Sequence, residues 1–245
     1  DCWETHASND LICSESQCVR HELQEKCEII IGDTDENTHD GEVVTFGAIM
    51  AMTTSEGASN PRGSYRSKAM ALAFDYFNER GGVEGKNFRV RICDHQKDSD
   101  RVKELAKYLI EDRGVPLVIT GGSSDTINAF QIAKPAEAMV MSISATAIDI
   151  THLDDNDLVW RVAPSDALIG KAVAESIEVD DGGAAPKIGV IYVNDPFGQG
   201  LHSEFTKRYK EIHADAEVLT GPFDENDEAT ILGSLHALNG DSPDK

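Results

Sequence analysis

Two short segments place hydroxyl groups beside glycine or alanine at points where a helix could begin. One is TGGSSDT at residues 120–126, and the other is SISAT at residues 142–146. Hydroxyls and free backbone N–H groups at a helix N-terminus can bind an anion such as a carboxylate, because the helix dipole favours negative charge there. In the simpler alternative, Ser124, Asp125 and Thr146 only cap helices, since these residue types are common N-caps. The spacing alone favours capping.

The five cysteines are unevenly distributed. Cys2, Cys13, Cys18 and Cys27 fall in the first 27 residues, and Cys93 stands alone in the rest of the chain. Four cysteines in an acidic segment too small for its own core favour two disulfides, with three possible pairings, and an oxidising compartment. A zinc site is less favoured, because the segment has no C-x-x-C pair. We therefore predict two bridges within this segment and a reduced, buried Cys93 thiol.

Motifs for catalysis are missing from the sequence. It contains no G-x-S-x-G, G-x-x-x-x-G-K-[ST] or H-E-x-x-H pattern. Gly198 and Gly200 begin like a dinucleotide-binding fingerprint, but Ser203 stands where the third glycine belongs. No nucleophile and base can be paired by spacing. We therefore predict that the protein is not an enzyme, with no catalytic residues, no metal site and no cofactor.

The charge of the chain also limits its partners. Its 245 residues include 22 Lys and Arg against 44 Asp and Glu, a net charge of −22. Such a surface repels phosphate backbones and anionic lipid, so nucleic acid is not an expected partner. The sequence has no apolar run long enough to span a bilayer and no apolar signal segment after Asp1. An export signal and a lipid anchor are expected upstream of the sequence given.

Residues 1–42 are predicted to form a cysteine-rich acidic head followed by a linker at about residues 32–41. Their local charge is 2 − 12 = −10. Asp33, Asp35 and Asn37 have the alternate spacing of a calcium loop. Thr38 and Val44, however, replace the glycine and the glutamate that such a loop requires. A solvated linker is the favoured interpretation.

From residue 43 onward, apolar strands alternate with amphipathic helices. This alternation predicts an α/β fold with parallel sheets covered by helices on both faces. The expected strands are 43–50, 88–93, 117–120, 139–143, 158–162, 187–193 and 216–219, and the expected helices are 64–80, 99–113, 125–138, 167–179, 200–212 and 228–238.

The alternation divides into two sets, joined near Pro164. We predict a first α/β lobe at residues 43–163 and a partial second lobe at residues 164–245. The second lobe has only two full strands, and a two-stranded sheet is marginal alone. The chain is therefore expected to be a fragment of a longer protein, with a truncated second lobe.

Six short motifs in order resemble the periplasmic leucine/isoleucine/valine-binding proteins, which are type I solute-binding proteins of ABC transporters. The matching stretches are GA at 47–48, FNERGGVEG at 77–85, CD at 93–94, GGSS at 121–124, SISAT at 142–146 and YVNDPFGQG at 192–200. The resemblance implies a two-lobed type I periplasmic-binding-protein fold with three hinge crossings and a small ligand held between the lobes. It also implies an extracytoplasmic, lipid-anchored protein that delivers an amino acid or related carboxylate to the membrane subunits of an ABC importer. The alternative is the ectodomain of a membrane sensor with the same fold.

The resemblance also implies site residues. Ser123 matches the serine that binds the ligand carboxylate, and Ser144, Ala145 and Thr146 match contacts to the amino-acid core. Phe197 stands where these proteins typically have a tyrosine, so the ligand can differ from theirs. The acidic residue that receives the ligand ammonium is expected beyond the end of the chain. Some relatives bridge a cysteine at position 93 to the loop near 122, where this chain has no cysteine.

Overall fold

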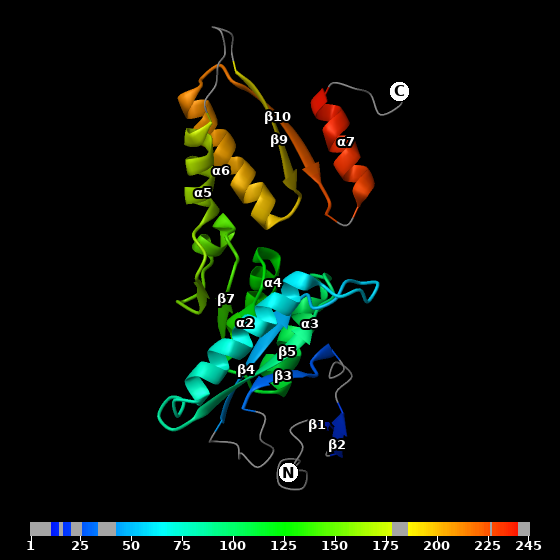
Figure 1. Ribbon diagram of the computed structural model, residues 1–245, viewed down its shortest axis with the longest axis vertical. Coiled ribbons are helices and arrows are strands. Elements are labelled where there is room, and N and C mark those ends of the chain that lie inside the picture. The colour runs from blue at the N-terminus through cyan, green and yellow to red at the C-terminus, as the bar shows by residue number, and fades with distance from the viewer. Residues whose placement is uncertain are drawn as a thin grey trace. The chain divides into compact units, whose positions relative to one another are not determined.

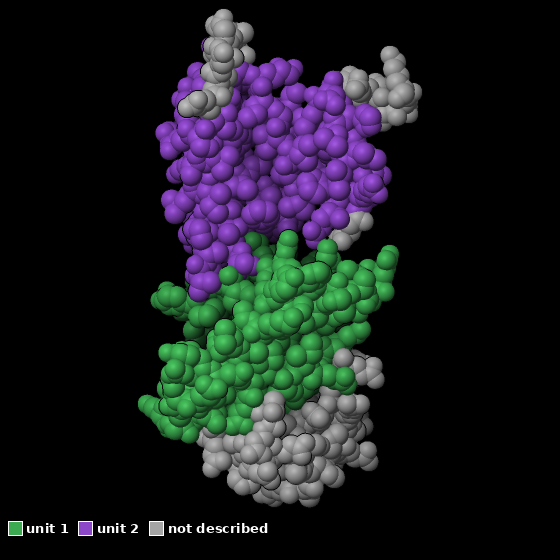
Figure 2. Space-filling model, in the orientation of Figure 1, with its two compact units in different colours: residues 1–143, 155–160 green, residues 144–154, 161–245 purple. Residues whose placement is uncertain are grey.

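The computed structural model describes residues 11–14, 17–20, 26–33, 43–177, 186–225 and 227–239 (Figure 1). The chain forms two compact units. The first takes in the described residues up to Ile143 together with Asp155–Trp160, and the second takes in Ser144–Asp154 and the described residues from Arg161 onward (Figure 2). The chain therefore passes between the units three times, and the segment 144–154, which the linear division of the sequence assigned to the first lobe, clusters with the second unit.

A six-stranded sheet forms the centre of the first unit. Its strand order is β3-β5-β4-β6-β7-β8, with β4 parallel to β5 and β6, and β6 parallel to β7. The strands are β3 (Ile29–Gly32), β4 (Val43–Met50), β5 (Asn87–Asp94), β6 (Leu117–Thr120), β7 (Met139–Ser142) and β8 (Val159–Arg161). A separate antiparallel pair is formed by β1 (Leu11–Ser14) and β2 (Gln17–Arg20).

Helices cover both faces of this sheet, as the alternation in the sequence predicts. On one face, Ala48 and Met50 of β4 pack in a cluster with Met70. On the other face, a Cβ at Gly47 would lie 2.8 Å from Leu109, so the backbone of β4 approaches that helical segment closely. The helices in the described part of this unit are α2 (Pro61–Asn78), α3 (Arg101–Lys107), the π-helix η2 (Tyr108–Asp112), α4 (Ser123–Ala133) and the 3-10 helix η3 (Lys134–Ala136).

One edge strand comes from the predicted head. Strand β3 pairs antiparallel with β5, with Ile29 opposite Ile92, and Cys27 forms a disulfide with Cys93. The prediction of a reduced Cys93 and of a Cys27 bridge within the head is therefore wrong. The reason is tertiary: the β3–β5 register brings the residues before Ile29 beside the end of β5. Predictions for Cys2, Cys13 and Cys18 fall outside the residues whose side chains the structure describes.

The described residues of the second unit form a two-stranded parallel sheet and three α-helices. Strands β9 and β10 pair with Lys187 opposite Glu217, and α5 packs against α6 so closely that a Cβ at Gly170 would lie 2.8 Å from the backbone nitrogen of Phe205. Its elements are the 3-10 helix η4 (Ile148–His152), α5 (Asp166–Ser176), β9 (Lys187–Val193), α6 (Pro196–Ile212), β10 (Glu217–Phe223) and α7 (Glu228–Asn239).

The expected strands and helices from residue 43 onward are confirmed over the described residues, with most differences at their ends. The second half of the predicted helix 99–113 is the π-helix η2, and η4 was not predicted. Four helices begin earlier than the apolar spacing predicts, and the two largest differences are at helices that open with proline. The Asn60 side chain caps α2 before Pro61, and the Asp195 side chain caps α6 before Pro196. Proline is favoured in the first helical turn, because its missing N–H would have no partner there. No helix in the described ranges is long and apolar enough to cross a membrane.

Candidate functional site

In the first unit, three strand-to-helix loops lie at one edge of the sheet. The parallel strands β4, β5 and β6 are neighbours, so their carboxyl ends share that edge. The loops are residues 51–60, 95–100 and 121–122. In open parallel sheets ligands bind outside the carboxyl ends of the strands, so the side chains of these loops define the candidate site.

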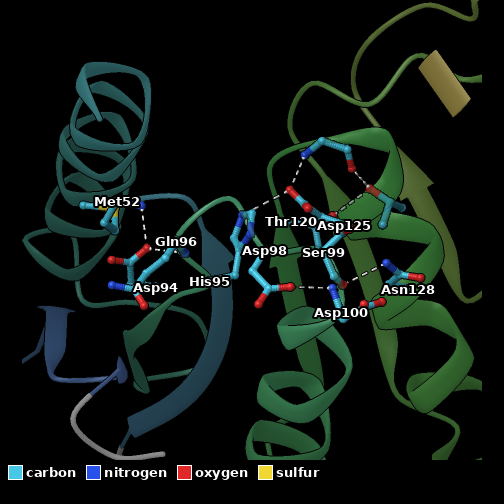
Figure 3. A network of polar contacts seen from close by, with 12 residues as sticks. Met52, Asp94, His95, Gln96, Asp98, Ser99, Asp100, Thr120, Asp125 and Asn128 are labelled. Carbon is cyan, nitrogen blue, oxygen red and sulfur yellow. Dashed lines mark hydrogen bonds and ion pairs between the residues drawn. The ribbon is translucent and has the colours of Figure 1, made fainter. Parts of the chain in front are cut away.

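Asp94 at the end of β5 ties two of the loops together (Figure 3). Its Oδ1 accepts hydrogen bonds from the backbone N–H groups of Met52 at 2.9 Å, Thr53 at 3.3 Å and Gln96 at 2.9 Å. Its Oδ2 accepts from the Thr53 hydroxyl at 2.5 Å. Hydrogen bonds to a carboxylate are stronger than those between neutral groups, so Asp94 fixes the positions of both loops.

His95 and Asp125 connect the β5–α3 loop to the start of α4. His95 is only 5% exposed, and its Nε2 lies 3.5 Å from Asp125 Oδ2. The same Asp125 oxygen accepts from the Gly122 backbone N–H at 3.1 Å, and Figure 3 shows His95 directed at Asp125. The Thr126 hydroxyl donates to the Gly122 carbonyl at 2.6 Å. The first turn of α4 is thus held from both sides.

Ser123 is the first residue of α4, and a cation lies beside that helix start. Ser123 is buried, and the N-cap of α4 is Gly122. A Cβ at Gly121 would lie 2.7 Å from Nη1 of Arg66, which extends from α2. Burial and repulsion by Arg62 lower the pKa of Arg66, whereas attraction to Asp125 raises it. A partly buried guanidinium therefore lies against the backbone that leads into α4.

This arrangement suits an anion. The helix N-terminus and the guanidinium both favour negative charge, and the Ser123 hydroxyl adds a hydrogen-bonding group. The sequence analysis identified Ser123 but missed Arg66, because Arg66 is a single basic residue on an amphipathic helix with no motif around it.

Among the described side chains, no group of three or more His, Cys, Asp and Glu could hold a metal ion.

In the second unit, Thr146 is bound to a buried carboxylate. Its hydroxyl donates to Asp166 Oδ2 at 3.0 Å, and its carbonyl accepts from the Asp166 backbone N–H at 2.8 Å. Thr146 does not cap a helix, because Ala147 precedes η4 and Ser165 caps α5. The capping alternative is therefore wrong for Thr146, whose hydroxyl hydrogen already has an acceptor.

Asp166 is an unusual carboxylate. It is fully buried, and its Oδ1 has no hydrogen-bond partner. Burial raises the pKa of Asp166, the Thr146 hydrogen bond and Arg161 lower it, and Asp195 raises it. No sequence signal singled out Asp166, which follows Ser165 as an ordinary acidic residue in the first turn of a helix.

Phe197 lies just after β9, in the first turn of α6, and is 38% exposed. Asp195 Oδ1 accepts from the Gly198 N–H at 2.8 Å. A Cβ at Gly198 would collide with the Val193 carbonyl, so this turn requires glycine. Phe197 thus follows the carboxyl end of a parallel strand, the position expected of a ligand contact.

The five residues expected to bind ligand are divided between the units. Ser123 belongs to the first unit, while Ser144, Ala145, Thr146 and Phe197 belong to the second. Ala145 is fully buried. Their part in ligand binding stays a prediction.

Residues 43–239 match the periplasmic binding protein family. A search of curated proteins found no match. Similar solved structures include a leucine binding protein, LivK, from Thermotoga maritima MSB8, with a TM-score of 0.66, 18% identity and coverage of 80% of this chain and 54% of that one. Another is the solute binding protein of an ABC transporter from Rhodopseudomonas palustris BisB5 in complex with 3,4-dihydroxy benzoic acid (TM-score 0.61, 20% identity, coverage 81% and 52%).

A fatty acid ABC transporter substrate-binding protein from Thermomonospora curvata has a TM-score of 0.65 at 16% identity, with coverage of 80% of this chain and 49% of that one. The chain thus spans about half the length of the solved structures that it matches. At these identities the structures establish the fold, while the family match extends over most of the chain. The chain belongs to the periplasmic binding protein family, and its fold is the two-lobed type I fold of that family.

Proposed function

We propose that this chain is the binding part of an extracytoplasmic solute-binding protein that captures a small carboxylate, such as a free amino acid, and delivers it to an ABC importer. The observation that carries the proposal is the start of α4, where the buried Ser123 follows Gly121 and Gly122 and the Arg66 guanidinium lies against Gly121. The family match supports binding as the activity.

The chemistry of the helix start favours a carboxylate over a neutral solute. A carboxylate at this place would face the positive end of the α4 dipole and the charge of Arg66. The nearby carboxylate of Asp125 is already engaged with Gly122 and His95, so it helps to position the backbone. A hydrogen bond to a charged group contributes about 1.5–3 kcal/mol, enough to select carboxylates.

We propose that Thr146 and Phe197 of the second unit also bind ligand, as the family resemblance implies. Thr146 is fixed by Asp166, so its hydroxyl oxygen can act only as an acceptor while that bond lasts. Phe197 offers an apolar ring without the hydroxyl of a tyrosine. These two residues suit a ligand with an apolar side chain.

The Cys27–Cys93 disulfide supports a location outside the cytoplasm, because disulfides persist in oxidising compartments. A lipid anchor stays a prediction from the sequence resemblance.

Calorimetry with a panel of free amino acids, 3,4-dihydroxybenzoate and their amides or esters tests the proposal. We expect binding that requires the free carboxylate. Ser123→Ala should weaken it about tenfold to a hundredfold, whereas Ser124→Ala, one position along the same turn, should leave it nearly unchanged.

A second pair of variants tests the cation. Arg66→Gln should weaken carboxylate binding by a similar factor, while Arg80→Gln, at an exposed position just after α2, should not. If Ser123→Ala and Arg66→Gln lower only the melting temperature and leave the affinity as it was, the proposed carboxylate site is wrong.

A further inference from the structure

Helix α2 exposes an apolar stripe on the side away from the sheet. Tyr65, Leu72 and Tyr76 are 69%, 74% and 51% exposed, and Ala69 between them is also exposed. The opposite side of the helix is buried, with Met70 in the core. Figure 1 shows α2 lying over the strands of the first unit. The helix is therefore apolar on two faces. The inner face is buried, whereas on the outer face the Arg80 guanidinium lies over the Tyr76 ring, 3.5 Å from its centre, and leaves Tyr65, Ala69 and Leu72 exposed.

The spacing of the stripe matches a helix-pairing seam. The four residues are separated by four, three and four positions, the alternation that keeps one line of side chains facing a partner helix in a coiled coil. Ala69 is small enough to let a second helix approach closely. A solvated helix face needs no such order, since scattered exposed apolar residues are normal on a surface.

Two opposite charges flank the stripe on one side. Lys68 and Asp75 are seven positions apart, about two helical turns, so they project from the same side of α2. Neither side chain forms an ion pair within the described part of the chain. A partner that satisfied both would need the reverse order of charges along its own helix.

A second copy of α2, running antiparallel, has that reverse order. We propose that two copies of this chain associate through α2 about a twofold axis, with Tyr65 facing Tyr76 and Ala69 facing Leu72 of the other copy. In that register Lys68 of each copy lies beside Asp75 of the other, so the surface is complementary to itself, as a twofold interface must be. The helix of 18 residues is about 27 Å long. A single helix pair of this length buries less surface than a standard interface of about 1,200–2,000 Å², so the dimer is weak and concentration-dependent.

Sedimentation equilibrium of the 245-residue chain, at concentrations up to about 1 mM, tests the proposal. Non-reducing electrophoresis of the same samples identifies any disulfide-linked copies. We expect a reversible monomer–dimer equilibrium that Leu72→Glu abolishes. Leu232→Glu is the matched control, because Leu232 is a half-exposed leucine on α7 of the second unit, and it should leave the equilibrium unchanged.

The charge pair provides the sharper test, since exposed substitutions seldom unfold a protein. Lys68→Glu should raise the dissociation constant several-fold, and Lys68→Glu combined with Asp75→Lys should restore it, because the double variant re-forms both pairs. A chain that stays monomeric throughout, a dimer indifferent to Leu72→Glu, or a double variant no better than the single one would overturn the proposal.

Discussion

Asp166 is the residue whose environment departs most from that of an exposed side chain of its type. It is fully buried, its Oδ1 lacks a hydrogen-bond partner, and burial raises its pKa. The folded protein therefore holds this proton more tightly than the unfolded chain. The ionised carboxylate costs stability as the pH rises above its usual pKa toward the raised value, and that loss persists at neutral pH.

We expect Asp166→Asn to stabilise the protein at pH 7, because the amide keeps an acceptor for Thr146 and carries no buried charge. The gain should shrink toward about pH 4, where the native carboxyl also becomes protonated. Urea unfolding of both proteins between pH 4 and pH 7 measures this difference in the free energy of unfolding. Asp149→Asn, at an exposed position in η4, should show no such pH-dependent gain. A loss of stability at pH 7 would mean that the fold needs the charge on Asp166.

The sequence could identify Ser123 but not Arg66 or Asp166. Ser123 stands between a predicted strand and a predicted helix, so its position follows from local pattern alone. The roles of Arg66 and Asp166 depend on contacts with residues 55 and 20 positions away, at Gly121 and Thr146. Burial and charge at such positions arise only once distant elements pack together.

At the scale of elements, the α5–α6 crossing depends on a glycine. Alanine in place of glycine normally stabilises a helix by about 0.5–1 kcal/mol. At Gly170, however, a Cβ would lie 2.8 Å from the Phe205 nitrogen and 3.0 Å from the Glu204 Cβ. The backbone atom cannot move aside cheaply, so the two helices would have to separate.

We predict that Gly170→Ala lowers the free energy of unfolding by about 1–3 kcal/mol. Gly233→Ala in α7 is the control, because nothing lies within 4 Å of a Cβ there, and it should raise that energy by about 0.5–1 kcal/mol. Denaturant melts of both variants provide the comparison. Equal, stabilising effects would show that α5 and α6 are not closely packed at Gly170.

The pattern of apolar residues predicted most of these helices and strands, because their formation follows from the local periodicity of apolar residues. The strands Val43–Met50, Leu117–Thr120 and Lys187–Val193 have the predicted bounds. Strand β3 was missed, since four residues at the edge of an acidic segment carry no periodicity that can be recognised. The π-helical turn Tyr108–Asp112 within a predicted α-helix depends on backbone hydrogen bonding that the sequence does not specify.

At the scale of the whole molecule, the alternation of strands and helices was sufficient to predict a two-unit α/β protein. The structure locates three crossings between the units, at residues 143–144, 154–155 and 160–161, which the sequence pattern did not predict. Residues 144–154 follow β7 directly in sequence, yet their contacts are with the second unit, where Asp166 binds Thr146.

The Cys27–Cys93 bridge should stabilise one unit and not the other. It joins residues 66 positions apart, and closing a loop of that length disfavours the unfolded chain by roughly 4 kcal/mol. Both cysteines and the strands that they link belong to the first unit. Replacing both cysteines with alanine should therefore speed hydrogen exchange in β4, β5 and β6, while β9 and α6 keep their native protection.

Mass spectrometry of peptides from each unit measures the two effects separately. Adding reductant to the double variant reveals any contribution from the remaining cysteines. Equal loss of protection in both units would show that they unfold as one cooperative body, whereas unchanged protection in the first unit would show that the bridge adds nothing to its stability.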